Sequence, residues 1–143
     1  MSAPTELTRF LTAQNGVWDR ALAELQAGEK RSHWMWFVLP QIAGLGTSEM
    51  SRRYAIADLA EAQAYLAHPV LGPRLRACVT AVLAHAGKTA HAIFGSPDDV
   101  KFRACLTLFA QAAPEDPLFP RALTAFYDGP DPKTEAMLRE EGL

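Results

Sequence analysis

Residues 97–112, PDDVKFRACLTLFAQA, predict the helix around which the rest of the chain packs. Their apolar side chains fall on almost every side of a helix, from Val100 and Phe102 through Cys105 to Phe109. A helix without a polar face cannot lie against water, so neighbouring helices must cover it on several sides. We expect this segment to be the buried central helix of an all-α fold.

The residues before this helix predict where it begins. Proline suits the first helical position because its missing N–H needs no partner there, and the Ser96 hydroxyl can accept a hydrogen bond from the Asp99 N–H. We therefore expect Ser96 to cap the helix. Proline follows a similar residue at four other predicted helix starts: Ala3-Pro4, His68-Pro69, Asp116-Pro117 and Asp131-Pro132.

The rest of the chain is divided into helices by the same signals. Glycines such as Gly28, Gly87 and Gly129 follow periodic apolar segments and predict helix ends. No segment alternates apolar and polar residues as a strand does, so we expect essentially no sheet. The sequence predicts one compact multihelical domain over residues 1–143, with about eight or nine helices. These lie near residues 5–14, 17–27, 48–56, 59–67, 70–86, 89–94, 97–112, 117–127 and 132–141.

Four polar residues interrupt the apolar surface of the central helix. Asp99, Arg103, Thr107 and Gln111 recur at every fourth position and so form one polar line. This line is consistent with a solvated edge that an ion pair stabilises, or with one wall of a cleft. Lys101 lies off the line but can reach the same opening.

The composition predicts a cytoplasmic protein with one core. The chain has 143 residues, of which 49% are hydrophobic and 21% charged, and a formal net charge of -2. This balance argues against a protein that coats nucleic acid or binds a membrane surface. Residues 1–10 lack the apolar run of a signal peptide, and no stretch is apolar enough to span a membrane. Cys78 and Cys105 lack partners at motif spacing, so we expect two buried thiols and no disulfide.

A second stretch, KRSHWMWFVLPQ at residues 30–41, concentrates charge and aromatic bulk in one place. Trp34 and Trp36 can stack on a flat ring, but large aromatics are often core anchors, so we expect one buried and one lining a site. His33 can exchange a proton near neutral pH, although a structural histidine bonded to a backbone carbonyl is the commoner role. Ser32 and His33 cannot form a nucleophile and base pair, because adjacent helical residues diverge by about 100°. The pattern is typical of a recognition site for a polar, anionic ligand.

Arginines and carboxylates supply the remaining candidate site residues. Guanidinium groups bind phosphate or carboxylate through two hydrogen bonds, although arginines and Glu49 on a solvated helix face are an equally good interpretation. We expect the candidates to converge on one cleft. The predicted catalytic residues are His33, Glu49, Asp98 and Asp99, and the predicted ligand-binding residues are Arg31, Trp34, Trp36, Gln41, Arg52, Arg53, Lys101 and Arg103.

Motifs for metals and cofactors are missing from the sequence. The four histidines form no i,i+4 pair and no carboxylates are clustered, so we predict no metal site. Gly44-Leu45-Gly46 is too short for a phosphate-binding loop and follows no predicted strand, which argues against a Rossmann or P-loop site. We therefore predict no cofactor.

Several motifs occur in one order along nearly the whole chain. They are RSHWMWF with PQ within residues 31–41, SEMSRRYAI at 48–56, HPVLG at 68–72, and IFGSPDD at 93–99 with Lys101 and TLF at 107–109. In these motifs the chain closely resembles bacterial domain-of-unknown-function family 1810. The resemblance implies a compact multihelical fold and no established activity. Relatives typically carry serines in place of Ala104 and Cys105, so the resemblance does not support hydroxyl chemistry at these two positions.

Two functions are consistent with these residues. The first is binding of a small anionic molecule, phosphorylated or nucleoside-containing, and hydrolysis of a glycosidic bond is one concrete version of it. In that version a tryptophan stacks on the base or sugar, arginines hold phosphate and a carboxylate activates water. The alternative is a non-enzymatic protein-interaction module that uses the aromatic patch Trp34–Phe37. A concave pocket favours the first function and a flat aromatic patch favours the second.

Overall fold

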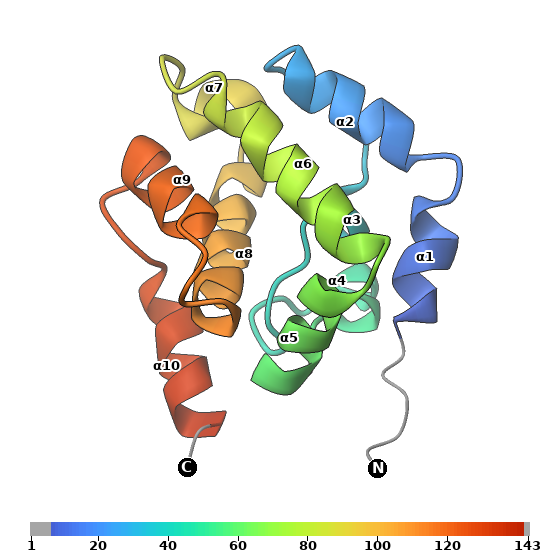
Figure 1. Cartoon of the computed structure of the whole chain (residues 1–143), viewed down its shortest axis with the longest axis vertical. Helices are drawn as coiled ribbons and strands as arrows, with labels where there is room; N and C mark the ends of the chain where they lie inside the picture. The colour runs from blue at the N-terminus through green and yellow to red at the C-terminus, as the bar shows by residue number, and fades with distance from the viewer. Residues whose placement is uncertain (1–6, 142–143) are drawn as a thin grey trace.

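Residues 7–141 are the part of the chain that the computed structural model describes, and they form ten helices and no strand (Figure 1). The predicted all-α fold is therefore confirmed. The helices are α1 (Thr8–Gln14), α2 (Trp18–Gln26), α3 (Met35–Val38), α4 (Glu49–Arg53), α5 (Leu59–Ala67), α6 (Leu71–Leu83), α7 (Ala90–Phe94), α8 (Asp98–Ala112), α9 (Leu118–Phe126) and α10 (Pro132–Glu141).

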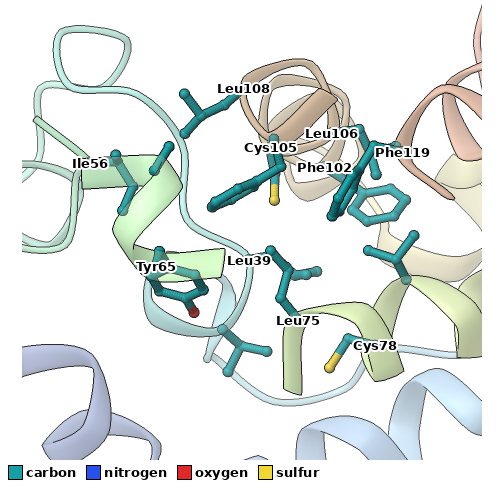
Figure 2. Packing of buried hydrophobic residues seen from close by; sticks show 14 of the residues in the cluster. Leu39, Ile56, Tyr65, Leu75, Cys78, Phe102, Cys105, Leu106, Leu108 and Phe119 are labelled. Atoms are coloured by element: carbon teal, nitrogen blue, oxygen red, sulfur yellow. The ribbon is translucent and has the colours of Figure 1, made fainter. Parts of the chain in front are cut away.

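The centre of the core is α8, as its all-round apolar sequence predicts. It contacts α5, α7, α9 and α10, and α9 and α10 lie beside it in Figure 1. The Phe109 ring is fully buried, with its centre 5.4 Å from that of Tyr65 in α5 and 6.0 Å from that of Phe119 in α9. Figure 2 shows side chains of α8, including Cys105, gathered with residues of α5, α6 and α9. Val100, on the first turn, is the exception to the prediction, because 59% of it is exposed.

The helix α6 covers this core with one face. Its buried residues, Leu71, Leu75, Cys78, Val79 and Val82 among them, recur at helical spacing. It contacts α2, α5 and α9. This agrees with the single apolar stripe that the sequence predicts for it.

The middle of the polar line on α8 contacts protein, whereas its end faces water. Arg103 Nε donates a hydrogen bond to the Gly129 carbonyl (2.9 Å), and the Thr107 hydroxyl accepts one from the Asp131 N–H (2.8 Å). Gly129 and Asp131 both belong to the connection between α9 and α10. Gln111, at the end of the line, is exposed, as a solvated edge predicts. For Arg103 and Thr107 neither sequence interpretation was right, because these side chains pair with backbone groups that lie far away in the sequence.

Three of the predicted helix caps are present. Asp116, Asp131 and His68 each accept a hydrogen bond from a backbone N–H two or three residues further along the chain. Such bonds satisfy N–H groups that have no partner within the helix. The pair Ala3-Pro4 lies outside the described residues.

The predicted cap at Ser96 is wrong. The Asp99 N–H, which Ser96 was expected to bind, instead donates to the Gly95 carbonyl (2.9 Å). The residue at the N-cap of α8 is Pro97, which makes no side-chain hydrogen bond, and the Val100 N–H in the first turn donates to Asp99 Oδ1 (2.9 Å). A backbone oxygen satisfies the Asp99 N–H equally well, so the Ser96 hydroxyl is left exposed beside the helix start.

The one-turn helix α3 lies within the aromatic stretch and was not predicted. Four residues are too few to show a helical period, so the sequence pattern could not reveal it. The loop that follows α3 is held by an isolated β-bridge between Ile42 and Ile56. In this bridge the Ala43 N–H donates to the Ile56 carbonyl (2.8 Å), which ties the loop to the segment after α4.

The segment that leads into α3 is held by one carboxylate, that of Glu24 in α2. Its Oε1 accepts hydrogen bonds from the backbone N–H groups of Arg31 (2.8 Å) and Ser32 (3.0 Å) and from Trp34 Nε1 (2.9 Å). Its Oε2 accepts a bond from the Ser32 hydroxyl (2.6 Å). Burial opposes the charged form, but these four bonds outweigh it and lower the pKa of Glu24 to about 2.

We expect Phe109→Ala to lower the free energy of unfolding by about 3–5 kcal/mol, because it leaves a cavity between three helices. Urea denaturation measures the change. Val100→Ala is the matched control on the same helix, and at an exposed site it should change stability by no more than about 0.5 kcal/mol. A loss below about 1 kcal/mol for Phe109→Ala contradicts the central position of α8.

We expect Glu24→Gln to destabilise the fold, and the difference from the parent to shrink in acid. Because the folded-state pKa of Glu24, about 2, lies below its ordinary value of 4.5, its stabilising effect is complete above pH 4.5. That effect is lost as the pH falls from 4.5 toward 2. Urea denaturation of both proteins over this range measures the difference, and a difference independent of pH contradicts the role of Glu24.

Candidate functional site

A groove lies where α3 and the loop after it meet the first turns of α8. Three adjoining cavities make up this groove, and the side chain of Lys101 lines all three. We call it the Lys101 groove. The predicted cleft residues His33, Trp36, Gln41, Asp98 and Lys101 line one or more of its cavities.

The first cavity, of about 260 Å³, is the more polar of the two large ones. Lys30, His33 and Asp98 line it together with Lys101 and the ring of Trp36. His33 is exposed at its edge, so its imidazole can reach a molecule held there. The cavity therefore combines hydrogen-bond donors with an aromatic wall.

The second cavity, of about 210 Å³, continues from Lys101 beneath the loop that contains Leu45 and Gly46. Val100 and Ala104 of α8 form its apolar side, and Lys133 lies at its rim. A third space of about 10 Å³, lined by Gln41, Ser51 and Tyr54 among others, joins the two beneath Lys101. One lysine, Lys101, is thus part of the lining of every part of the groove.

The two lysines beside Asp98 form ion pairs of different length. Asp98 forms a close ion pair with Lys30, with 2.8 Å between Nζ and Oδ2, and the side chain of Lys30 is only 6% exposed. Lys101 Nζ lies 3.7 Å from Asp98 Oδ1, near the outer limit of an ion pair, and 5.1 Å from the centre of the Trp36 ring. Lys30 is therefore fixed within the protein, whereas Lys101 can turn to a ligand.

The two tryptophans of the aromatic stretch have separate roles, as expected of one buried and one lining residue. Trp34 is fully buried, and its Nε1 is satisfied by Glu24. Trp36 is half-buried and lines the groove, and its Nε1 has no hydrogen-bond acceptor among the described residues. Met35 and Phe37 are buried as well, so the stretch does not form the flat exposed patch that a protein-interaction module requires.

Several predicted site residues lie outside the lining of the groove. Arg31 is largely exposed and pairs with Glu29 at 2.6 Å. Glu49, Arg52 and Arg53 are exposed on α4. The structure does not bring these four to the groove, because only the inner face of α4, with Ser51, is turned toward it.

The remaining candidates on α8 also have partners elsewhere. Arg103 binds the connection between α9 and α10, and Asp99 Oδ2 lies 3.4 Å from His91 Nδ1. Burial and the nearby charge of Asp99 raise the pKa of Tyr127, whose hydroxyl donates to the Asp99 carbonyl. This side of α8 is therefore occupied by contacts within the protein.

Neither cysteine is a reactive group of the groove. Both are free and buried, and burial raises the pKa of Cys78 to about 12 and that of Cys105 well above its ordinary value. The thiolate is the reactive form of cysteine, so both remain neutral at physiological pH. Within residues 7–141, no three His, Cys, Asp or Glu side chains are grouped closely enough to hold a metal ion.

Lys30, Ser51 and Lys133 line the groove and were missed by sequence reasoning. Lys30 and Arg31 are adjacent, and the sequence favoured the guanidinium of Arg31, whereas the fold turns Lys30 inward. The backbone N–H of Lys30 donates a hydrogen bond to the Ile93 carbonyl (2.7 Å), which sets this direction. No local sequence pattern predicts that bond. Glu24, which orders the whole segment, resembles any acidic residue on a solvated helix face.

The comparisons with known proteins agree with this fold. No helix within the described residues has the length and apolarity needed to cross a membrane. No curated protein matches the chain significantly. The structure is similar to the crystal structure of the conserved hypothetical protein Rv1873 from Mycobacterium tuberculosis, with 46% sequence identity and a TM-score of 0.93 over 96% of this chain and 99% of that chain. Residues 4–138 match the family described as "Protein of unknown function (DUF1810)", and the chain therefore belongs to this family.

Proposed function

We propose that the protein binds a small anionic molecule, phosphorylated or nucleoside-containing, with its anionic group at Lys101. The observation that supports this most directly is that Lys101 faces all three cavities of the groove while its own ion pair is long, at 3.7 Å. A charge-assisted hydrogen bond to a ligand oxygen is stronger than so distant a pair. The ammonium group is therefore available to the ligand.

The charge balance of the groove supports an anionic ligand. Lys30, Lys101 and Lys133 line the two large cavities together with two carboxylates, those of Asp98 and Asp131, which leaves one positive charge in excess. Asp131 Oδ2 is also engaged, because it accepts hydrogen bonds from the backbone and side chain of Thr134. A phosphate group between Lys101 and His33 would meet donors on two sides.

The Trp36 ring supports the same site. It lines the groove, and Lys101 Nζ lies 5.1 Å from its centre, so a molecule held at Lys101 would lie against the face of the indole. Its Nε1 has no acceptor among the described residues, but this atom is buried. The ring face, rather than the N–H, is therefore what Trp36 offers to a ligand.

Hydrolysis of a glycosidic bond is a narrower version of the proposal, and it depends on Asp98. Of the three predicted carboxylates only Asp98 lines the groove, and its two oxygens face Lys30 and Lys101. This geometry supports a role in positioning the lysines better than a role in activating water. Binding alone is therefore the function that the site supports best.

We expect adenosine 5′-monophosphate and ribose 5-phosphate to raise the melting temperature, because a ligand that binds only the folded state stabilises it by mass action. Lys101→Met should weaken binding about tenfold, because it removes one charge-assisted hydrogen bond to the ligand. Thermal-shift titration and calorimetry measure both effects.

Lys88→Met is the matched control for this experiment. Lys88 is exposed on the connection before α7, and its ammonium group donates a hydrogen bond to the Gly28 carbonyl. Arg31→Ala and Arg53→Ala should also bind like the parent, since neither side chain lines the groove. Equal affinity in the Lys101→Met variant and the parent, or no shift with either phosphate, overturns the proposal.

We expect the Trp36 indole N–H to shift in a ¹⁵N–¹H spectrum when ribose 5-phosphate is added, because a molecule held against the ring changes the magnetic environment of this proton. The chain has three tryptophans, and Trp36→Phe assigns the signal by its loss. The signal of Trp34, which already binds Glu24, is the internal control and should stay in place. Unchanged positions of all three signals at saturating ligand contradict the role of Trp36.

A further inference from the structure

We infer that the ligand of the Lys101 groove is a phosphate monoester whose organic part is apolar or a flat ring, and that this part occupies the second cavity. The inference rests on the proposed function and adds the chemistry of the uncharged half of the ligand. It follows from the unequal character of the two large cavities.

Both cavities contain Lys101 and Pro97 in their lining, so a molecule anchored at Lys101 can extend from one into the other. The first carries Lys30, His33 and Asp98, which suit a charged group. The second has the larger apolar wall, formed by Leu45, Val100 and Ala104, with polar residues around it: Gln41, Ser51, Asp131 and Lys133. One cavity thus fits the phosphate and the other fits what the phosphate is attached to.

Val100 marks the second cavity as a binding surface. Only two large apolar residues among the described ones are exposed, Val100 at 59% and Val70 at 38%. Val100 lies on the first turn of α8, ahead of the run of buried residues that begins at Phe102. A ligand group that covers it removes apolar surface from water, which favours binding by about 25 cal/mol per Å².

The size of the second cavity is suited to a ring. A cavity of about 150 Å³ lined by apolar side chains accommodates benzene, and the volume here is about 210 Å³. Its wall is already formed, because the Ile42–Ile56 bridge holds the loop that carries Leu45. On the other side of this loop, Gly44 lies against Met137 of α10, where a β-carbon would collide with the methionine side chain.

The test compares inorganic phosphate with phenyl phosphate, measured by calorimetry on the intact protein. We expect phenyl phosphate to bind at least about tenfold more tightly than phosphate. Val100→Thr keeps the side-chain shape but replaces a methyl group with a hydroxyl, and it should reduce this gain severalfold. Val70→Thr, the matched change at the other exposed valine, should leave the gain unchanged. Lys101→Met should lower the affinity for both probes by the same factor.

A second measurement places the ring directly. Nuclear Overhauser contacts between the phenyl protons and the Val100 methyl groups are expected, and contacts only to other methyl groups overturn the inference. If phosphate binds in a Lys101-dependent way but phenyl phosphate binds no more tightly, the inference fails and the proposed function stands. If neither probe binds, the proposed function fails and the inference fails with it.

Discussion

The hydrogen bonds to the Glu24 carboxylate determine the path of the chain between α2 and α3, and the groove depends on that path. Four donors from three residues of this stretch, Arg31, Ser32 and Trp34, meet this one side chain. They turn Trp34 into the core, so that Trp36, two residues later, lies on the other side and lines the groove. A lowered pKa keeps the carboxylate charged, and hence able to accept all four bonds, at any pH the fold is expected to meet.

The second constraint is that α8 serves both the core and the groove. Most residues from Phe102 to Ala112 are buried against neighbouring helices, which holds the axis of α8 in place. Its first turn projects beyond that cover, and there Asp98, Val100 and Lys101 face the groove. A rigid helix end positions side chains more accurately than a loop does, because packing of the remaining turns restrains it.

The groove relies on lysines, although the sequence offered arginines nearby. Lys30 is buried against Trp34, with Nζ 4.8 Å from the ring centre, and neutralises Asp98. The ion pair of Asp98 with Lys101 is the longer one, at 3.7 Å. A flexible ammonium group can turn between a carboxylate and a ligand, whereas a guanidinium fork requires a fixed planar partner.

Local pattern determined which segments are helical, that α8 is central and that residues 30–41 supply candidate site residues, because each of these follows from the periodicity or chemistry of neighbouring residues. The pattern could not predict α3, because four residues are too few to show a helical period. It also could not predict that the Gly95 carbonyl accepts the hydrogen bond from the Asp99 N–H, because this is a backbone contact. Only the tertiary structure decided that Lys30 rather than Arg31 points inward, that Asp99 and Arg103 face the connection after α9, and that Glu24 orders the site. These outcomes depend on which distant groups come within hydrogen-bond distance, and sequence spacing carries no information about such distances.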